Sequence, residues 1–131
     1  MAFEWTQEYS VENPLLDSQH QKLFDIINEL FDSMTKKAEL SKIEAIFASL
    51  ESYGTEHFAE EEKLMRQASY PHLEAHQKEH ADFFERIAQL KNQLRSGEKV
   101  YTVPIETLIF IRNWLKQHIL HKDKLYAPFL R

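Results

Sequence analysis

The sequence has no cysteine and no long apolar run, and from its first residues we expect no secretory signal. Without cysteine, the chain can form neither disulfides nor thiolate metal sites, and it has no cysteine nucleophile. That absence fits a reducing compartment, and we expect a cytoplasmic protein. No stretch has the length and apolarity of a membrane span, and the N-terminal stretch MAFEWTQEYSVENP lacks the basic and apolar regions of a signal peptide. We therefore expect no membrane insertion.

Turn-forming residues and basic charge are also scarce. The 131 residues include only two glycines and four prolines, and this low number of helix-breaking residues favours long helices. The formal net charge is −5, whereas binding to nucleic-acid phosphates needs a basic face, so we expect no nucleic-acid partner. The length suffices for one domain with a sizeable core, and we expect a single domain over residues 1–131.

Apolar residues recur every three or four positions in four segments, as helices with one buried face require. Asn13 and Pro14 are typical of a helix start, and Gly97 is typical of a helix end. The expected helices span about residues 14–37, 41–66, 70–96 and 104–122.

Four amphipathic helices with short connections predict an all-α fold, an antiparallel up-down-up-down four-helix bundle. Residues 1–13 precede the first helix as an N-terminal arm. We expect this arm, which contains Phe3 and Trp5, to pack over the outside or one end of the bundle.

Several histidines follow the helical period. In the stretch YPHLEAHQKEH, His76 and His80 lie four residues apart, so they project from one helix face and can bind one metal together. His57 and Glu61 repeat this spacing on the preceding helix. A single histidine on an apolar stripe is usually a core residue with a hydrogen-bond partner. It is therefore the whole set, and no single member, that indicates a metal site.

The set gathers at one end of the expected bundle. In an antiparallel bundle, the starts of the first and third helices share an end with the finishes of the second and fourth. At about 1.5 Å per residue, each candidate lies within roughly two turns of that end. Burying these groups without partners would be very costly, and a metal centre would supply the partners. The candidates are His20, His57, Glu61, His76, His80 and His118. We assign His72 and His121 to the surface.

Imidazole nitrogen and carboxylate oxygen without sulfur suit iron, manganese or zinc. A single zinc takes four protein ligands, or three and a water, which is fewer than this set offers. Two metal ions bridged by a carboxylate account for the set more economically. The Glu-x-x-His motif of ferritin-like di-iron proteins is absent from the sequence, so we do not expect that carboxylate-rich type of site.

Four stretches, DSQHQKLFDIIN, HFAEEEKLM, YPHLEAHQKEH and WLKQHILHKDK, together resemble the hemerythrin family in its single-domain bacterial form. The resemblance covers nearly the whole chain. It implies two non-haem iron ions, bridged by carboxylates and an oxo or hydroxo group, that bind dioxygen reversibly. The family pattern implies His76, His80 and His118 as ligands of one iron, His20 and His57 as ligands of the other, and Glu61 and Asp123 as bridging carboxylates.

The end of the fourth helix leaves two candidates. On an ideal helix, His121 lies about 60° around the axis from His118 and Asp123 about 140°, so periodicity alone favours His121. The family pattern favours Asp123, whose second carboxylate would neutralise charge at two dications. To reach the centre, Asp123 requires a π-type loosening of the helix, and His121 would then face solvent or the bundle edge.

The resemblance also implies a dry apolar pocket for oxygen beside the ligands. Residues that flank the ligands on their helices could form it, and the same residues could equally be ordinary bundle core. These residues are Leu23, Phe58, Trp114, Leu115 and Ile119.

We therefore expect an oxygen-binding protein, not an enzyme, that serves oxygen storage, delivery or sensing. The alternatives are a di-iron enzyme that reduces peroxide or nitric oxide, and an iron buffer. The sequence has no substrate-cleft pattern, and a small histidine-rich site speaks against bulk iron storage. The 131 residues show no pattern of a signalling domain, so we expect storage or delivery more than sensing. We expect a monomer with dioxygen as its ligand and an oxygen-consuming enzyme as recipient.

Overall fold

The computed structural model describes residues 4–35, 40–97 and 102–130. Its long helices are α1 (Pro14–Thr35), α2 (Leu40–Gln67), α3 (Leu73–Ser96) and α4 (Val103–Trp114), and α4 continues as the π-helical η2 (Leu115–Asp123). Short helical segments lie at the two ends of the chain: η1 (Gln7–Tyr9), α5 (Lys124–Tyr126) and η3 (Ala127–Leu130).

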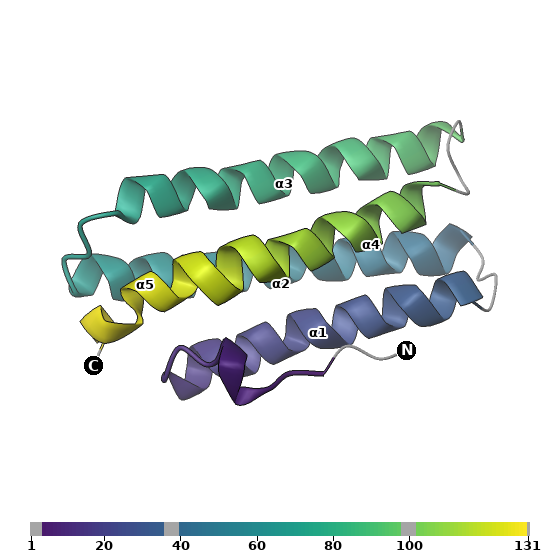
Figure 1. Cartoon of the computed structure of the whole chain (residues 1–131). Coiled ribbons are helices and arrows are strands. Elements are labelled where there is room, and N and C mark those ends of the chain that lie inside the picture. The colour runs from purple at the N-terminus through teal and green to yellow at the C-terminus, as the bar shows by residue number, and fades with distance from the viewer. Residues whose placement is uncertain (1–3, 36–39, 98–101, 131) are drawn as a thin grey trace.

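The long helices form a four-helix bundle, as the sequence predicts. Contacts join α1 to α2, α2 to α3, α3 to α4 and α4 to α1, so each helix packs against its neighbours in chain order. Figure 1 shows that consecutive helices run in opposite directions, and the described residues contain no strand. The all-α, antiparallel, up-down-up-down arrangement is confirmed. None of the described helices is long and apolar enough to cross a membrane.

Asn13 and Gly97 lie at helix ends, as the sequence predicts. The side-chain oxygen of Asn13 accepts a hydrogen bond from the Leu16 N–H at 3.1 Å, so Asn13 caps α1. Gly97 ends α3 in the left-handed region, with φ of 77° and its N–H bonded to the carbonyl of Leu94. The expected end of the first helix, near residue 37, lies outside the described residues.

The third helix begins later than the sequence indicates. We expect its start near residue 70, whereas α3 begins at Leu73. Tyr70 precedes a proline, which disfavours the helical conformation there. Its N–H instead bonds to the carbonyl of Met65 at 2.9 Å, and Ser69 adopts a left-handed φ of 54°. These features close the end of α2, so the segment belongs to the α2–α3 turn.

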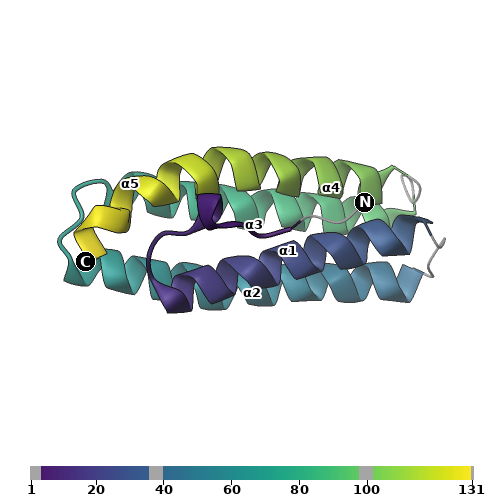
Figure 2. The same ribbon diagram turned by 60° about the horizontal axis from the view of Figure 1, so that its bottom comes forward.

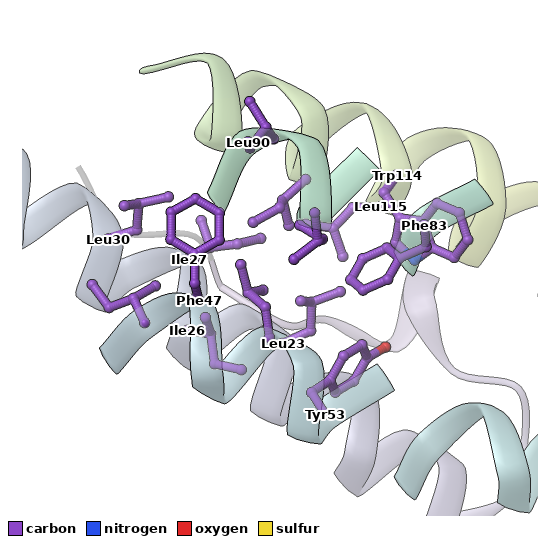
Figure 3. Close-up of a cluster of buried hydrophobic side chains, with 14 of the residues drawn as sticks. Leu23, Ile26, Ile27, Leu30, Phe47, Tyr53, Phe83, Leu90, Trp114 and Leu115 are labelled. Atoms are coloured by element: carbon purple, nitrogen blue, oxygen red, sulfur yellow. The ribbon is translucent and has the colours of Figure 1, made fainter. Parts of the chain in front are cut away.

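A polar layer interrupts the apolar interior near one end of the bundle. The larger apolar cluster, part of which Figure 3 shows, includes Leu23 and Phe47 and extends along the bundle. A smaller cluster contains Leu16 and Tyr126 and lies beyond the layer. His20 lies between Leu16 and Leu23 in α1, one helical turn from each, so the buried histidine layer is closed by apolar side chains on both sides.

The N-terminal arm packs on the bundle as expected. Trp5 and Tyr9 pack against the larger apolar cluster, and the Tyr9 ring meets Phe24 edge-on at 4.9 Å. Figure 2 shows η1 beside the fourth helical segment, where it contacts η2. The Ser10 hydroxyl donates to Asp17 at 2.6 Å, which ties the arm to α1. Phe3 lies outside the described residues.

Candidate metal centre

The fold brings all seven expected ligand residues into one layer. Their exposed fractions range from 0% to 4%. Their candidate ligand atoms form two groups, and within each group every atom lies within 4.8 Å of the others. The first group comprises Glu61, His76, His80 and His118, and the second comprises His20, His57, Glu61 and Asp123.

Glu61 belongs to both groups and turns one oxygen toward each. Its Oε1 lies 2.9 Å from His80 Nε2 and 3.4 Å from His76 Nε2. Its Oε2 lies 3.0 Å from His57 Nε2 and 3.5 Å from His20 Nε2. The carboxylate therefore spans the two histidine groups.

Asp123 spans the same two groups from the opposite helix. Its Oδ1 lies 2.8 Å from His76 Nε2 and 3.0 Å from His118 Nε2. Its Oδ2 lies 3.2 Å from His20 Nε2. Two carboxylates that each offer one oxygen to either side are the arrangement that bridges a pair of cations.

The π-helical segment η2 explains how Asp123 reaches the layer. Residues 115–123 are wound with the wider π-helical turn, so side chains five positions apart share a face. His118 and Asp123 are both buried on this face, whereas His121 is exposed. The expected loosening of the helix and the outward position of His121 are confirmed.

The unsatisfied polar atoms of the layer fit the binding of two metal ions. Several of its buried nitrogen and oxygen atoms approach one another without hydrogen-bond geometry, which is costly for polar atoms in a dry interior. Such atoms include His57 Nε2, His80 Nε2, His118 Nε2, both ring nitrogens of His20, Glu61 Oε1 and Asp123 Oδ2. Cations bound between the imidazole Nε2 atoms and the carboxylates would satisfy all of these atoms except Nδ1 of His20. Nitrogen and oxygen donors without sulfur fit iron, manganese or zinc.

The electrostatics of the layer favour anionic carboxylates. Burial alone would raise the pKa of Glu61, but the neighbouring His57 and His20 hold it well below its usual range. The pKa of Asp123 is also lowered, since His118 and His20 outweigh burial and the charge of Glu61. Both carboxylates are therefore ionised at neutral pH and ready to bind cations.

The pKa values of the buried histidines shift in two directions. Burial lowers the pKa of an imidazole, but Asp123 and Glu61 outweigh it and raise the pKa of His20 to about 9 and of His76 to about 10. Burial is likewise outweighed at His118, where Asp123 raises the pKa to about 9. At His57 burial prevails, and its pKa is lowered despite the charge of Glu61. At neutral pH, these raised pKa values favour protonated His20, His76 and His118 beside the two carboxylates of the metal-free protein.

A second ring of polar side chains orients the histidines. Gln19 Oε1 lies 2.7 Å from His57 Nδ1, and Glu62 Oε2 lies 2.8 Å from His80 Nδ1. With Nδ1 bonded outward, each ring turns Nε2 toward the centre.

Two further residues complete the surroundings. Glu79 Oε2 lies 3.3 Å from His118 Nδ1. The Tyr126 hydroxyl donates to Glu61 Oε2 at 2.6 Å. Sequence reasoning does not find Gln19, Glu62, Glu79 or Tyr126, because their partners lie on other helices. Glutamates and glutamines beside a ligand look the same in sequence as residues of a solvated helix face.

Aromatic rings cover the layer on the side of the larger apolar cluster. Phe58 stacks on His80 with ring centroids 3.9 Å apart, and Trp114 stacks on His118 at 4.1 Å. All five residues expected to form an oxygen pocket are buried in this cluster: Leu23, Phe58, Trp114, Leu115 and Ile119. Their burial beside the ligands fits both a pocket and an ordinary core.

Comparison with known proteins agrees with this geometry. Residues 12–130 match the family described as Hemerythrin HHE cation binding domain. A bacteriohemerythrin of Methylococcus capsulatus is 34% identical over 127 residues, covering 96% of this chain and 95% of that protein. One of Clostridium acetobutylicum is 30% identical over 128 residues, covering 95% and 98%. A crystal structure of wild-type hemerythrin superposes with a TM-score of 0.87 at 32% identity, covering 99% of this chain and 98% of that one. Sequence, fold and the buried histidine–carboxylate layer thus lead to one conclusion, that the chain belongs to the hemerythrin family.

Proposed function

We propose that this protein binds dioxygen reversibly at a non-haem di-iron centre. The observation that supports this most directly is the pair of buried carboxylates, Glu61 and Asp123, each of which offers one oxygen to each histidine group. In this proposal His76, His80 and His118 would hold one iron, His20 and His57 would hold the other, and Glu61 and Asp123 would offer one oxygen to each.

Two ferrous ions held there would supply the electrons that dioxygen takes up on binding and returns on release. The chain contributes five imidazoles against two carboxylates, a less electron-rich donor set than a carboxylate-rich site. This donor set disfavours cleavage of the O–O bond and favours reversible binding. The group of His20 and His57 has one imidazole fewer than the other group, so a metal ion bound there would have one protein ligand fewer and could accept an external ligand.

The apolar cluster keeps water from the layer in this proposal. Phe58 and Trp114 cover His80 and His118 with stacked rings, and both aromatic residues are buried. Leu23, Leu115 and Ile119 would complete an apolar pocket for oxygen. The burial of these side chains supports the pocket, because an apolar surrounding would keep water away from the metal positions.

The ligand layer is better suited to binding than to turnover of a larger substrate. Its seven side chains are at most 4% exposed, which supports a ligand as small as dioxygen. We therefore propose an oxygen-binding protein for storage or delivery. We extend this proposal to a cytoplasmic monomer that passes oxygen to an oxygen-consuming enzyme. Sedimentation of the iron-loaded protein tests whether it is a monomer in solution.

Anaerobic loading with ferrous iron tests the function. We expect two irons per chain and a visible absorption band that appears with oxygen and disappears on deoxygenation over repeated cycles. A stoichiometry of one iron per chain, or irreversible oxidation at the first exposure, would refute reversible oxygen binding.

A further inference from the structure

We propose that the residues behind the histidines make the two metal positions electronically unequal. Glu62 and Glu79 place negative charge behind the position of His76, His80 and His118 (the three-histidine position). Gln19 places a neutral amide behind the position of His20 and His57 (the two-histidine position). The inference rests on the proposed di-iron function and assigns these three residues a positioning and tuning role.

Glu62 is held firmly against the three-histidine position. Its Oε2 lies 2.8 Å from His80 Nδ1, and its Oε1 accepts a hydrogen bond from Gln77 Nε2 at 3.0 Å. Both carboxylate oxygens of this α2 residue are thus bonded to α3. The Glu62 side chain is 23% exposed, so water screens its charge only in part. A fixed, partly buried carboxylate can act on the His80 ring continuously.

Glu79 adds a second charge behind the same position. Its Oε2 lies 3.3 Å from His118 Nδ1, an ion-pair distance without hydrogen-bond geometry, and its side chain is 34% exposed. The longer distance and greater exposure make it the weaker of the two. Two of the three imidazoles at this position therefore face a carboxylate on their outer side.

The two-histidine position differs in both of its imidazoles. His57 Nδ1 lies 2.7 Å from Gln19 Oε1, an uncharged acceptor. His20 Nδ1 is buried and has no hydrogen-bond partner among the described residues. No carboxylate among those residues forms an ion pair with Nδ1 of either histidine, since their carboxylate contacts are all made through Nε2.

This difference changes how strongly the rings donate to a metal. A carboxylate that accepts the Nδ1–H bond polarises the imidazole toward imidazolate and makes Nε2 a stronger donor. Hydrogen bonds to an ionised acceptor are roughly twice as strong as those between neutral groups. A metal ion at the three-histidine position would therefore be the more electron-rich and the easier to oxidise. A metal ion at the two-histidine position would be the stronger Lewis acid.

A reciprocal exchange of charge tests the inference. Glu62→Gln removes the charge behind His80, and Gln19→Glu introduces one behind His57, each with nearly the same side-chain shape. In the zinc-loaded protein, we expect the Nδ1–H proton NMR resonance of His80 to lie downfield of that of His57. Glu62→Gln should move the first resonance upfield, Gln19→Glu should move the second downfield, and the double variant should reverse their order. Glu85→Gln, an equal charge change at an exposed α3 residue, should move neither.

Redox titration of the iron-loaded protein gives an independent readout. We expect Glu62→Gln to raise the midpoint potential of the first one-electron oxidation, with two irons still bound. A residue with only a structural role would change metal content or stability but not the order of the NMR resonances. If Glu62→Gln fails to fold, the Gln19→Glu variant alone tests the inference, through the expected downfield move of the His57 Nδ1–H resonance.

The outcomes separate the inference from the function on which it rests. Wild-type protein that fails to bind two zinc or iron ions per chain refutes the di-iron centre, and the inference with it. Wild-type protein that binds two ions, with variants whose histidine resonances and potential stay unchanged, refutes the inequality of the positions alone.

Discussion

At the scale of single residues, Glu61 makes the most contacts in the polar layer. Its two oxygens meet four histidine rings, and Oε2 also accepts the Tyr126 hydroxyl at 2.6 Å. Tyr126 is fully buried in the smaller apolar cluster, so its hydroxyl bonds the carboxylate from the side opposite the larger cluster. Glu61 is thereby fixed in orientation before any cation binds.

We expect Tyr126→Phe to destabilise the metal-free protein while leaving the bundle intact. The ring still fills its site, but a buried bond to a charged acceptor is lost, which costs about 2 kcal/mol. Urea unfolding followed by circular dichroism measures the change. Tyr70→Phe, in the same apolar cluster, is the matched control and should cost less. Equal losses in the two variants would show that the bond to Glu61 contributes little.

The rings over the histidines allow a second test at this scale. We expect Phe58→Thr and Trp114→Thr to admit water and accelerate autoxidation several-fold while two irons remain bound. Each loses buried aromatic volume, at about 3–5 kcal/mol of stability. Phe47→Thr, a similar loss in the fully buried core away from the histidine contacts, should leave the autoxidation rate unchanged. If all three variants autoxidise at the wild-type rate, Phe58 and Trp114 are only core residues.

At the scale of elements, the fourth helical segment carries the least regular geometry and the ligands that depend on it. The α-helical period of α4 gives way in η2 to the wider π-helical turn, which aligns His118 with Asp123. A regular helix would instead bring His121 toward the face of His118. The π-helical backbone therefore decides that this helix end gives the layer a carboxylate, Asp123, and not a second imidazole, His121.

Asp123→Ala and His121→Ala test that choice. Because Asp123 faces both histidine groups, its loss should abolish the coupled di-iron spectrum or remove much of the iron. His121 is exposed, so its replacement should keep both the spectrum and two irons. Iron analysis and electronic absorption distinguish the variants. The opposite pattern would move the ligand assignment to His121.

How much of this was accessible from sequence also differs between elements. The helices, the Asn13 cap and the Gly97 stop follow from local patterns, and the structure confirms them. The start of α3 does not, because Tyr70 and Pro71 belong to the turn that closes α2. Periodicity could not choose Asp123 either, since a π-helix breaks the period on which that reasoning depends; only the family pattern pointed to it.

At the scale of the whole molecule, the polar layer joins all four helical segments. His20 comes from α1, Glu61 from α2, His80 from α3 and Asp123 from η2. Cations bound only by the folded layer would therefore hold this end of the bundle together and stabilise the native state. In their absence, protons on the imidazoles take over part of that role.

The metal-free protein should lose stability as pH rises above neutral. The folded pKa values of His20 and His118 are about 9 and that of His76 is about 10, against 6.5 for an unperturbed histidine. A raised pKa means that the folded state binds the proton more tightly. The stabilisation is therefore complete below pH 6.5 and is lost as pH rises through 9 to 10. The lowered pKa of His57 has the opposite effect on the pH dependence of stability, but it is one group, whereas three groups have raised pKa values.

Urea unfolding of the metal-free protein at pH 6, 8 and 10 should show this decline. Metal loading should suppress it, because cations replace the three protons between nitrogen and carboxylate. Loading with zinc at constant pH 7 should accordingly release about three protons per chain, from His20, His76 and His118, measured by the base needed to hold the pH. Stability that rises from pH 6.5 to 9, or zinc binding without proton release, would show that the carboxylates are balanced in some other way. The proton count thus connects the charge of one buried layer to the stability of the entire bundle.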